Sequence, residues 1–237
     1  MIASRDMERR IEQMFSRIAR RYDRLNHLLS LGADRRWRAR AVEVLDGRRT
    51  KRVLDLCCGT GDLGIECLER NEDAHVTFAD FSTRMLERAR RKLAGKPAWA
   101  VRSQIVMADG LKLPFPDRSF DAVLCGFGVR NMSSDAVGLL EIKRVLKSGG
   151  ACVILEFFRP ATWPAHLLYW TIGTTFVPLA GLIVAGDFGA YRYLTRSILN
   201  HMRLDEFAFL METIGFRRVE SAHLSTGITG LVHGRIP

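Results

Sequence analysis

Paired cysteines are what this sequence most clearly lacks. Its five cysteines stand at positions 57, 58, 67, 125 and 152, an odd number with no C-x-x-C pair among them. Structural zinc sites need paired ligands at fixed spacing, and secreted disulfide scaffolds carry cysteines at higher density. We therefore expect neither a metal centre nor a disulfide framework.

The amino terminus lacks the charged-then-apolar order and the small-residue cleavage site of a secretory signal, so we expect a cytoplasmic protein. Internal repeats and low-complexity tracts are also absent. The 237 residues are 47% hydrophobic, which is enough for one well-buried domain. Within that single domain, 1–237, we expect four parts. They are a helical arm over 1–50, a cofactor-binding core over 51–157, an apolar insertion over 158–202, and a C-terminal helix and strands over 203–237.

Negative charge is scarce in the arm. Residues 1–52 hold 15 Arg and Lys against 7 Asp and Glu, a net charge of +8 out of +10 for the whole chain. Such a segment suits anionic lipid or nucleic acid, or is simply a solvated helix face. Apolar residues recur at helical spacing between the arginines, which predicts amphipathic helices that pack on the domain, lie on a membrane or close over a ligand. These residues are Ile11, Phe15, Ile18, Tyr22, Leu25 and Leu29.

The core alternates strand and helix patterns. We predict strands at 52–56, 75–80, 104–109, 120–127 and 151–157, with helices at 61–70, 82–93 and 133–146. Ser82 is a plausible N-cap, and Gly149 and Gly150 follow the last of these helices. This alternation predicts an α/β fold with a parallel sheet covered by helices on both faces.

The insertion interrupts that rhythm. Residues 167–186 contain no charge, which is long enough for a membrane span, but Pro178, glycines and threonines dilute the hydrophobicity. We expect an apolar insertion or lid. A helix at 204–215 and two strands at 217–224 and 227–235 follow. Running antiparallel, they complete a seven-stranded, mostly parallel sheet.

A glycine loop, GTGDLG at 59–64, lies between the first strand and its helix, and Asp80 follows Gly61 by 19 residues. Glycines permit a sharp turn and close approach of a ligand, and an acid at the end of the next strand can accept hydrogen bonds from ribose hydroxyls. The loop alone predicts an adenosine-type cofactor and leaves NAD open. Asp80 as a mere helix-capping acid is the alternative.

The later motifs MADGLKLPFPDRSFDAV (107–123) and RVLKSGG (144–150) resemble those of class I S-adenosylmethionine-dependent methyltransferases, which have a Rossmann-like fold. The resemblance implies S-adenosylmethionine as cofactor, with Asp109 facing the adenine amine. Cys57 and Cys58 then become small walls beside the loop. The implied cofactor-binding residues are Asp55, Gly59, Thr60, Gly61, Asp80, Asp109, Gly110 and Gly126.

Nearly the whole chain resembles one family, the C-methyltransferases of menaquinone and ubiquinone biosynthesis. YDRLNHLLSLGADRRW (22–37) and RVLKSGGACVILEFF (144–158) match its two signatures, and FGVRN (127–131) and GDFGAYRYLTRSI (186–198) match two further stretches. Four positions depart from the usual pattern: Leu25 for Met, Asp34 for His, Ser148 for Pro and Phe158 for Ser. No role is carried over to residue 34.

This resemblance implies methylation of a ring carbon in a reduced polyprenyl quinol. Demethylmenaquinol is the expected acceptor; the alternatives are a 2-polyprenyl-6-methoxybenzoquinol or another small hydrophobic molecule. Arg130 and Asn131 would face a quinol oxygen, Tyr191 and His201 would line the lid, and the ordinary pKa of histidine suits His201 to proton transfer.

A quinol of the bilayer also gives the basic arm and apolar insertion a common purpose, peripheral contact with the inner face of the cell membrane. Nucleic acid is not an expected partner, because GFGVRN stands where amino-methylating nucleic-acid enzymes carry N/D-P-P-Y/F, and no aromatic and basic platform is present. An NAD oxidoreductase and a binding protein without turnover remain as competing interpretations. The oligomeric state stays open between a monomer and a homodimer.

Overall fold

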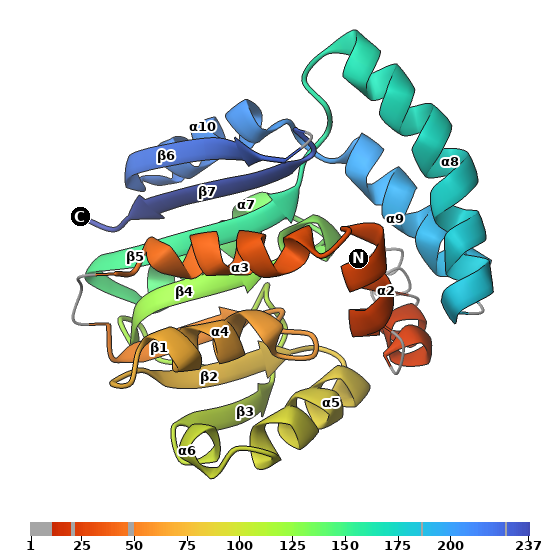
Figure 1. Cartoon of the computed structure of the whole chain (residues 1–237). Coiled ribbons are helices and arrows are strands. Elements are labelled where there is room, and N and C mark those ends of the chain that lie inside the picture. Colours follow the sequence, from red (N-terminus) through yellow and green to blue (C-terminus); the bar gives the residue numbers. More distant parts are fainter. Residues whose placement is uncertain (1–10, 20–21, 47–49, 186, 226) are drawn as a thin grey trace.

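The structure of the protein is a computed structural model that describes residues 11–19, 22–46, 50–185, 187–225 and 227–237. Seven strands form one sheet in the order β3-β2-β1-β4-β5-β7-β6 (Figure 1). Strands β1 to β5 pair in parallel, and β7 runs antiparallel to β5 and β6. Both predictions, the parallel core and the antiparallel final pair, are confirmed. The strands are β1 (Arg52–Leu56), β2 (His75–Asp80), β3 (Ser103–Met107), β4 (Phe120–Gly126), β5 (Leu146–Phe157), β6 (Arg217–Leu224) and β7 (Thr229–Arg235).

Helices cover both faces of the sheet. One face carries α3 (Ala33–Glu43), α4 (Asp62–Arg70), α5 (Thr83–Ala94) and the short α6 (Pro97–Ala100), and the other carries α7 (Asp135–Val145) and α10 (Leu204–Ile214). Side chains alternate between the two layers along each strand, so Val53 packs with one cluster and Leu54 with the other. This double burial explains why the parallel strands read as nearly continuous apolar runs.

The strand order places the crevice of the sheet beside β1. From β1 the chain builds outward to β2 and β3, and then crosses back to β4 on the other side. In open α/β sheets, ligands bind at the carboxyl ends of the strands where the order reverses. The glycine loop follows β1 directly and therefore lies at this switch point.

The apolar insertion folds into two helices, α8 (Trp163–Ala185) and α9 (Phe188–Asn200), which pack together beside the carboxyl ends of the parallel strands (Figure 1). The Thr195 hydroxyl donates to the carbonyl of Gly173 at 2.6 Å, and a side chain at 173 would collide with Thr195. Helix α8 continues through Pro178, a residue that usually ends a helix. Among the described residues, no helix is both long and apolar enough to cross a membrane.

The arm packs on the domain. Residues 11–18 are helical, α2 (Tyr22–Leu29) follows, and α3 continues over the sheet. Met14 and Ile18 are buried against Ala190 and Tyr191 of α9 in a small separate cluster. Arg17 and Asp187 form an ion pair at 3.2 Å. Residues 1–10 and the side chain of Leu25 lie outside the part of the chain that the structure describes.

Two predicted boundaries are wrong. Helix α7 ends at Val145, not beyond it, because Leu146 already pairs with Phe120 and β5 includes both glycines that were expected to follow the helix. The register between β4 and β5 then shifts between Phe120 and Ala122, so the extra residues of β5 around the two glycines form an irregularity within the strand. Strand β3 is also shorter than expected, which leaves Asp109 in the loop beyond it.

Candidate active site

A cavity of about 460 Å³ lies at the carboxyl ends of the strands, between the sheet, the arm and the α8–α9 pair. Most of the predicted site residues line it, and Gly61 and His201 do not. The lining residues that the sequence predicted are Asp55, Gly59, Thr60, Asp80, Asp109, Gly110, Gly126, Arg130, Asn131 and Tyr191. The fold thus gathers these ten residues from five segments of the chain around one space, at 55–60, 80, 109–110, 126–131 and 191.

The glycines of the loop after β1 have different tasks. Gly59 has a φ of 54°, and a side chain there would point into open space. Gly61 has a φ of 87° at the start of α4, where a side chain would press on Ala89 and Phe78 at 3.2–3.3 Å. Gly59 therefore keeps the cavity open to a ligand, and Gly61 lets the helix pack against β2.

Asp55 is a fully buried carboxylate at the end of β1. Its Oδ2 accepts a hydrogen bond from the Gly64 amide at 2.8 Å, and its Oδ1 has no partner among the described residues. Burial raises the pKa of Asp55 to about 8 despite that bond, and the charges of Asp80 and Asp62 add to the rise. An unpaired buried carboxylate is costly, so this side of the cavity favours a cationic ligand group.

Asp80, at the end of β2, is held by two backbone amides. Its Oδ2 accepts from Gly59 and its Oδ1 from Ser82, both at 2.8 Å. Burial raises the pKa of Asp80 although these amides lower it. A carboxylate has about four acceptor positions, so two remain for ribose hydroxyls. Helix capping falls to Ser82, whose hydroxyl accepts from the Met85 amide, and Asp80 is therefore not a mere capping acid.

The remaining cofactor residues close the cavity from β3 and β4. Asp109 accepts a hydrogen bond from the Leu111 amide at 2.9 Å in the loop after β3. A side chain at Gly110 would collide with Met132, and one at Gly126 would press on Leu63. Positions 110 and 126 therefore require glycine, because neighbouring side chains occupy the space that a Cβ atom would take.

This donor set fits S-adenosylmethionine better than a dinucleotide. Asp80 suits the ribose, and the unpartnered oxygen of Asp55 suits a positive charge. An anionic pyrophosphate at the start of α4 would instead meet the carboxylates of Asp55 and Asp62. The electrostatics therefore favour a cationic adenosine cofactor.

Arg130 belongs to a short helix, η1 (Val129–Asn131), that follows β4. Its guanidinium is almost fully buried, pairs with the buried Glu156, and donates to the carbonyl of Phe127 at 2.9 Å. Burial lowers the pKa of Arg130, but Glu156 outweighs this effect and the net shift is upward, so the side chain stays cationic. Its Nη2 makes no hydrogen bond to a described residue.

Phenols surround Arg130. The Tyr193 hydroxyl donates to Asn131 Oδ1 at 3.0 Å, and the amide of Asn131 donates to the Phe127 carbonyl at 3.3 Å. Burial raises the pKa of Tyr22 and of Tyr193, although Arg130 lowers both. These phenols therefore remain protonated near neutral pH and act as hydrogen-bond donors.

The two residues that were predicted to line the lid, Tyr191 and His201, differ in their position relative to the cavity. Tyr191 lines the cavity, and its buried hydroxyl has no partner among the described residues. His201 lies outside the cavity: its ring stacks on Phe158, its Nδ1 lies 3.1 Å from the Phe157 carbonyl, and its Nε2 lies 3.4 Å from Asp135. Burial lowers the pKa of His201, but Asp135 outweighs it and the net shift is upward. His201 therefore does not line the cavity and its ring packs on Phe158 instead, while its role in proton transfer stays a prediction.

A cluster of hydrogen bonds and ion pairs, here called the latch, joins the arm to the glycine loop and was not predicted from the sequence. The Thr60 hydroxyl donates to Asp23 of α2 at 2.5 Å. Lys92 of α5 donates to Thr60 at 2.9 Å, and pairs with Asp23 at 2.8 Å and with Asp62 at 2.5 Å. Asp23 stands in the first family signature, so that signature was the available sign of it. Lys92 lies among basic residues of an amphipathic helix and gives no sign of its own.

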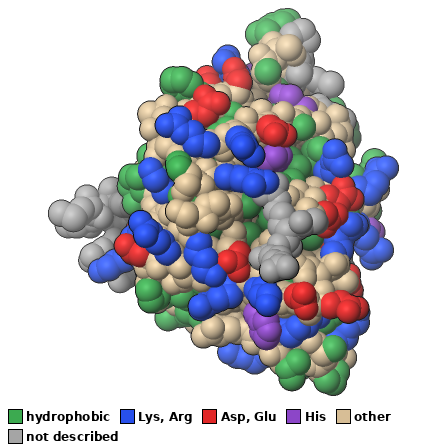
Figure 2. Space-filling view, turned by 90° about the vertical axis from the view of Figure 1, so that its left-hand side faces the viewer, with side chains coloured by type: hydrophobic (Ala, Val, Ile, Leu, Met, Phe, Trp, Pro, Cys, Tyr) green, Lys and Arg blue, Asp and Glu red, His purple; other side chains and the backbone are tan. Residues whose placement is uncertain are grey.

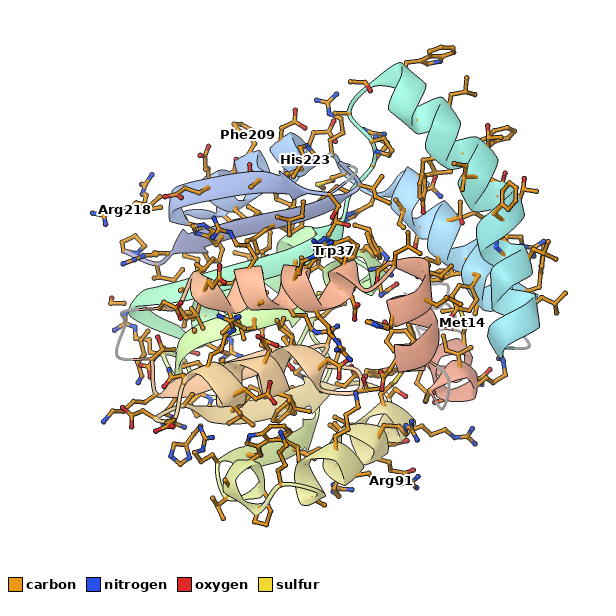
Figure 3. The ribbon with its side chains drawn as sticks, viewed as in Figure 1. Met14, Trp37, Arg91, Phe209, Arg218 and His223 are labelled. Atoms are coloured by element: carbon orange, nitrogen blue, oxygen red, sulfur yellow. The ribbon has the colours of Figure 1, made fainter. Side chains whose placement is uncertain are left out.

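Aromatic side chains line the cavity on the side of β4 and β5, away from β2. Trp37 of α3 lies 6.2 Å from both Phe127 and Phe157, and the two phenylalanine rings lie 4.5 Å apart. The indole of Trp37 also donates to the Ser225 hydroxyl at 2.8 Å, which ties α3 to the turn between β6 and β7. Figure 3 shows Trp37 over the strands and Met14 near α9, so the arm roofs the cavity between these two places.

Asp34, one of the four departures from the family pattern, contacts three neighbouring side chains. His27 Nδ1 lies 2.9 Å from its Oδ1, Ser30 donates to the same oxygen at 3.1 Å, and Arg38 pairs with Oδ2 at 2.9 Å. Burial raises the pKa of Asp34, but His27 and Arg38 outweigh it and the net shift is downward. The carboxylate therefore holds α2 and α3 together beside the cavity.

Comparison with known proteins agrees with this geometry. Residues 3–235 match the profile of the ubiE/COQ5 methyltransferase family. The chain is 41% identical to the demethylmenaquinone methyltransferase of Deinococcus radiodurans, over 95% of this chain and 92% of that one. It is 40% identical to the ubiquinone/menaquinone biosynthesis C-methyltransferase UbiE of Geobacter sulfurreducens, over 95% of this chain and 88% of the relative.

A solved structure shares the fold at low identity. It is a SAM-dependent methyltransferase from Thermotoga maritima, with a TM-score of 0.68 and 17% identity, covering 95% of this chain and 99% of that one. At such identity the likeness speaks for the Rossmann-like methyltransferase architecture alone. With the family profile spanning nearly all of its length, the chain is a methyltransferase that belongs to the ubiE/COQ5 methyltransferase family.

Proposed function

We propose that this enzyme transfers a methyl group from S-adenosylmethionine to a ring carbon of a reduced polyprenyl quinol, demethylmenaquinol. The observation that carries the proposal is the shape of the one cavity described above. A carboxylate suited to a cation stands at one end, and Trp37, Phe127 and Phe157 stand at the other. Relatives named for this reaction at about 40% identity support the choice of acceptor.

Cofactor binding would fall to the residues at the ends of β1 and β2. S-adenosylmethionine, when bound, supplies an electrophilic methyl group. Asp55 would neutralise positive charge on the cofactor, Asp80 would accept from the ribose hydroxyls, and the bare backbone of Gly59 would allow close contact. Asp109 and Gly110 would border the adenine.

The acceptor side would work mainly by alignment. A ring held rigidly between aromatic walls in a water-poor cavity gains from proximity, on the order of 7–11 kcal/mol at best. Arg130 is a poor base because it stays protonated, so it would act as a cationic donor toward a quinol oxygen through its Nη2. A cation beside that hydroxyl favours its ionised form, which pushes electron density into the ring before carbon attack. The newly methylated ring carbon would then lose its proton to water, and the ring would regain aromaticity.

The test is incubation with S-adenosylmethionine carrying a labelled methyl group and with each reduced quinol in turn. Mass spectrometry should show the labelled methyl on demethylmenaquinol. Transfer to a methoxylated benzoquinol instead would replace the acceptor, in keeping with the ubiquinone branch named for some relatives. Transfer to neither quinol, with S-adenosylhomocysteine still bound, would reject the acceptor and keep the cofactor. Tight NAD binding without binding of S-adenosylhomocysteine would reject both.

We also infer reversible contact of α8 with an anionic membrane, where a polyprenyl quinol resides. Helix α8 is apolar around most of its described surface, and α9 beside it carries the exposed Arg192 and Arg196, which form no ion pair with a described residue. Apolar contact plus basic charge is the combination that holds peripheral proteins on lipid. The exposed large apolar residues of α8 are Trp163, Leu167, Trp170, Ile172, Phe176, Leu179 and Leu182.

Co-sedimentation with anionic vesicles at low salt tests this contact. Binding should weaken with added salt and with Trp170→Ser plus Phe176→Ser. Phe209→Ser is the matched control, since Phe209 is equally exposed but lies on α10 (Figure 3). The side of the molecule away from the cavity carries basic side chains with acidic ones between them (Figure 2). Protein that ignores such vesicles at low salt would contradict the inference.

A further inference from the structure

Thr229 is a buried polar residue that neither the sequence motifs nor the proposed chemistry uses. It is the first residue of β7, it is 1% exposed, and its side chain borders the cavity. Its hydroxyl has no hydrogen-bond partner among the described residues. A buried hydroxyl without a partner destabilises a fold, whereas a valine of the same shape would not. The position therefore suits a polar ligand atom.

The strand order assigns this hydroxyl to the acceptor and not to the cofactor. The cofactor residues follow β1, β2, β3 and β4, while β7 lies on the far side of β5. Neighbouring strands are spaced by about 4.8 Å, so Thr229 is set roughly 10 Å from β4 and roughly 14 Å from β1 across the sheet. Next to Thr229 the cavity is lined by Phe157 of β5, whose ring lies 6.2 Å from that of Trp37.

Thr229 and Arg130 stand on either side of Phe157. Thr229 is the pairing partner of Phe157 across β5 and β7. The Arg130 guanidinium lies 5.5 Å from the centre of the Phe157 ring. A reduced quinol is a flat apolar ring with hydroxyls at opposite positions, so it needs hydrogen-bonding groups at two separated places around an aromatic wall.

We propose that the Thr229 hydroxyl hydrogen-bonds one ring oxygen of the quinol while Arg130 faces the other, so that Thr229 sets the orientation of the ring. This inference rests on the proposed function. It makes Thr229 a specificity-determining residue, because a ring with one oxygen missing or displaced would leave the hydroxyl unpaired.

The experiment compares Thr229→Val and Thr229→Ser with wild type in three measurements: thermal stability without ligand, affinity for S-adenosylhomocysteine, and kcat and KM for the reduced quinol. Thr195→Val is the matched control, since Thr195 is equally buried but donates to the Gly173 carbonyl. We expect Thr229→Val to keep its stability and its S-adenosylhomocysteine affinity while the quinol KM rises about 3- to 10-fold. Thr229→Ser should stay within about twofold of wild type, and Thr195→Val should lose stability.

Each contrary outcome has its own meaning. Thr229→Val that destabilises the free protein as Thr195→Val does would overturn the inference, because the hydroxyl would then be satisfied within the fold. Weaker S-adenosylhomocysteine binding would overturn it by moving Thr229 to the cofactor. An unchanged quinol KM would overturn it while wild-type turnover upholds the proposed function. Wild type that methylates no quinol would instead reject the proposed function, and with it the inference.

Discussion

The two ends of the cavity are built by different means. At the cofactor end, backbone amides between 2 and 21 positions away hold the carboxylates of Asp55, Asp80 and Asp109. At the acceptor end, contacts join distant parts of the chain, and Trp37 reaches Ser225 across 188 positions. The difference shows that neighbouring strand–loop–helix units of the parallel sheet specify the cofactor cradle, whereas the acceptor pocket exists only once the arm, the insertion and the last strands have assembled.

The largest effects should come from the two loop glycines, which this comparison separates. Gly59→Val should lose cofactor binding altogether, because its side chain would fill open space that the ligand needs; the φ of 54° strains a valine there, but no neighbouring atom is displaced. Gly61→Val should also lose binding, but through a stability loss of about 1–3 kcal/mol, because its side chain meets Ala89 and Phe78. Thermal melting with calorimetric titration of S-adenosylhomocysteine distinguishes them. Equal melting temperatures for the two variants would contradict the separation.

Asp55→Asn should weaken S-adenosylmethionine binding about 100-fold, since a buried charge facing a cation is worth about 3 kcal/mol. The folded pKa of about 8 lies above that of an unfolded aspartate, so the neutral form favours folding and stability falls as the pH rises from about 4 to 8. The variant should therefore melt higher than wild type at pH 8 without ligand.

The same shift predicts the pH dependence of binding. A bound cation favours ionised Asp55, so wild-type affinity should fall by up to about tenfold for each pH unit below 8. Asp55→Asn should lose this slope. A wild-type affinity that is flat between pH 6 and 8 would show that Asp55 does not meet the cofactor charge.

Lys92→Met should have a moderate effect, because it releases the latch between the arm and the glycine loop. The Lys92 ammonium is partly exposed, so its contacts with Asp23 and Thr60 are worth about 1 kcal/mol, or about fivefold in the KM values of both substrates. Lys96→Met is the control, as that lysine is exposed and its ammonium contacts Glu69 at 3.3 Å and the Trp99 ring, away from the cavity. Equal KM values for the Lys92→Met and Lys96→Met variants in steady-state kinetics would contradict a role of the latch in substrate binding.

The smallest effect should come from substituting the adjacent cysteines beside the glycine loop, Cys57 and Cys58. All five cysteines are free, and burial raises the pKa of Cys58 well above its usual value, which makes it a poor nucleophile. Cys57→Gly should stay within about twofold of wild-type activity, and it relieves a φ of 53° that glycine adopts at lower cost. A loss of turnover in this variant would give Cys57 a chemical role.

The same division between local and distant contacts explains which features of the fold and the site could be predicted from the sequence. The glycine loop, Asp80 and the Ser82 cap were predictable because their partners lie within one supersecondary unit. Family motifs placed Arg130 and Asn131 at the site, but not the burial of Arg130 against Glu156. Lys92, Thr229 and the position of His201 depend on how distant helices and strands meet, and no local pattern encodes that. Helix α8 of the insertion was missed because apolar residues around the whole helix leave no periodic pattern.

The central claim is that one cavity presents the cofactor methyl group to an electron-rich, reduced ring. The most direct measurement supplies the enzyme with S-adenosylmethionine and with demethylmenaquinone held either reduced or oxidised, and follows methylated product by mass spectrometry. The account predicts methyl transfer to the quinol and none to the quinone. Equal transfer to both, or transfer to neither while S-adenosylhomocysteine binds tightly, would contradict it.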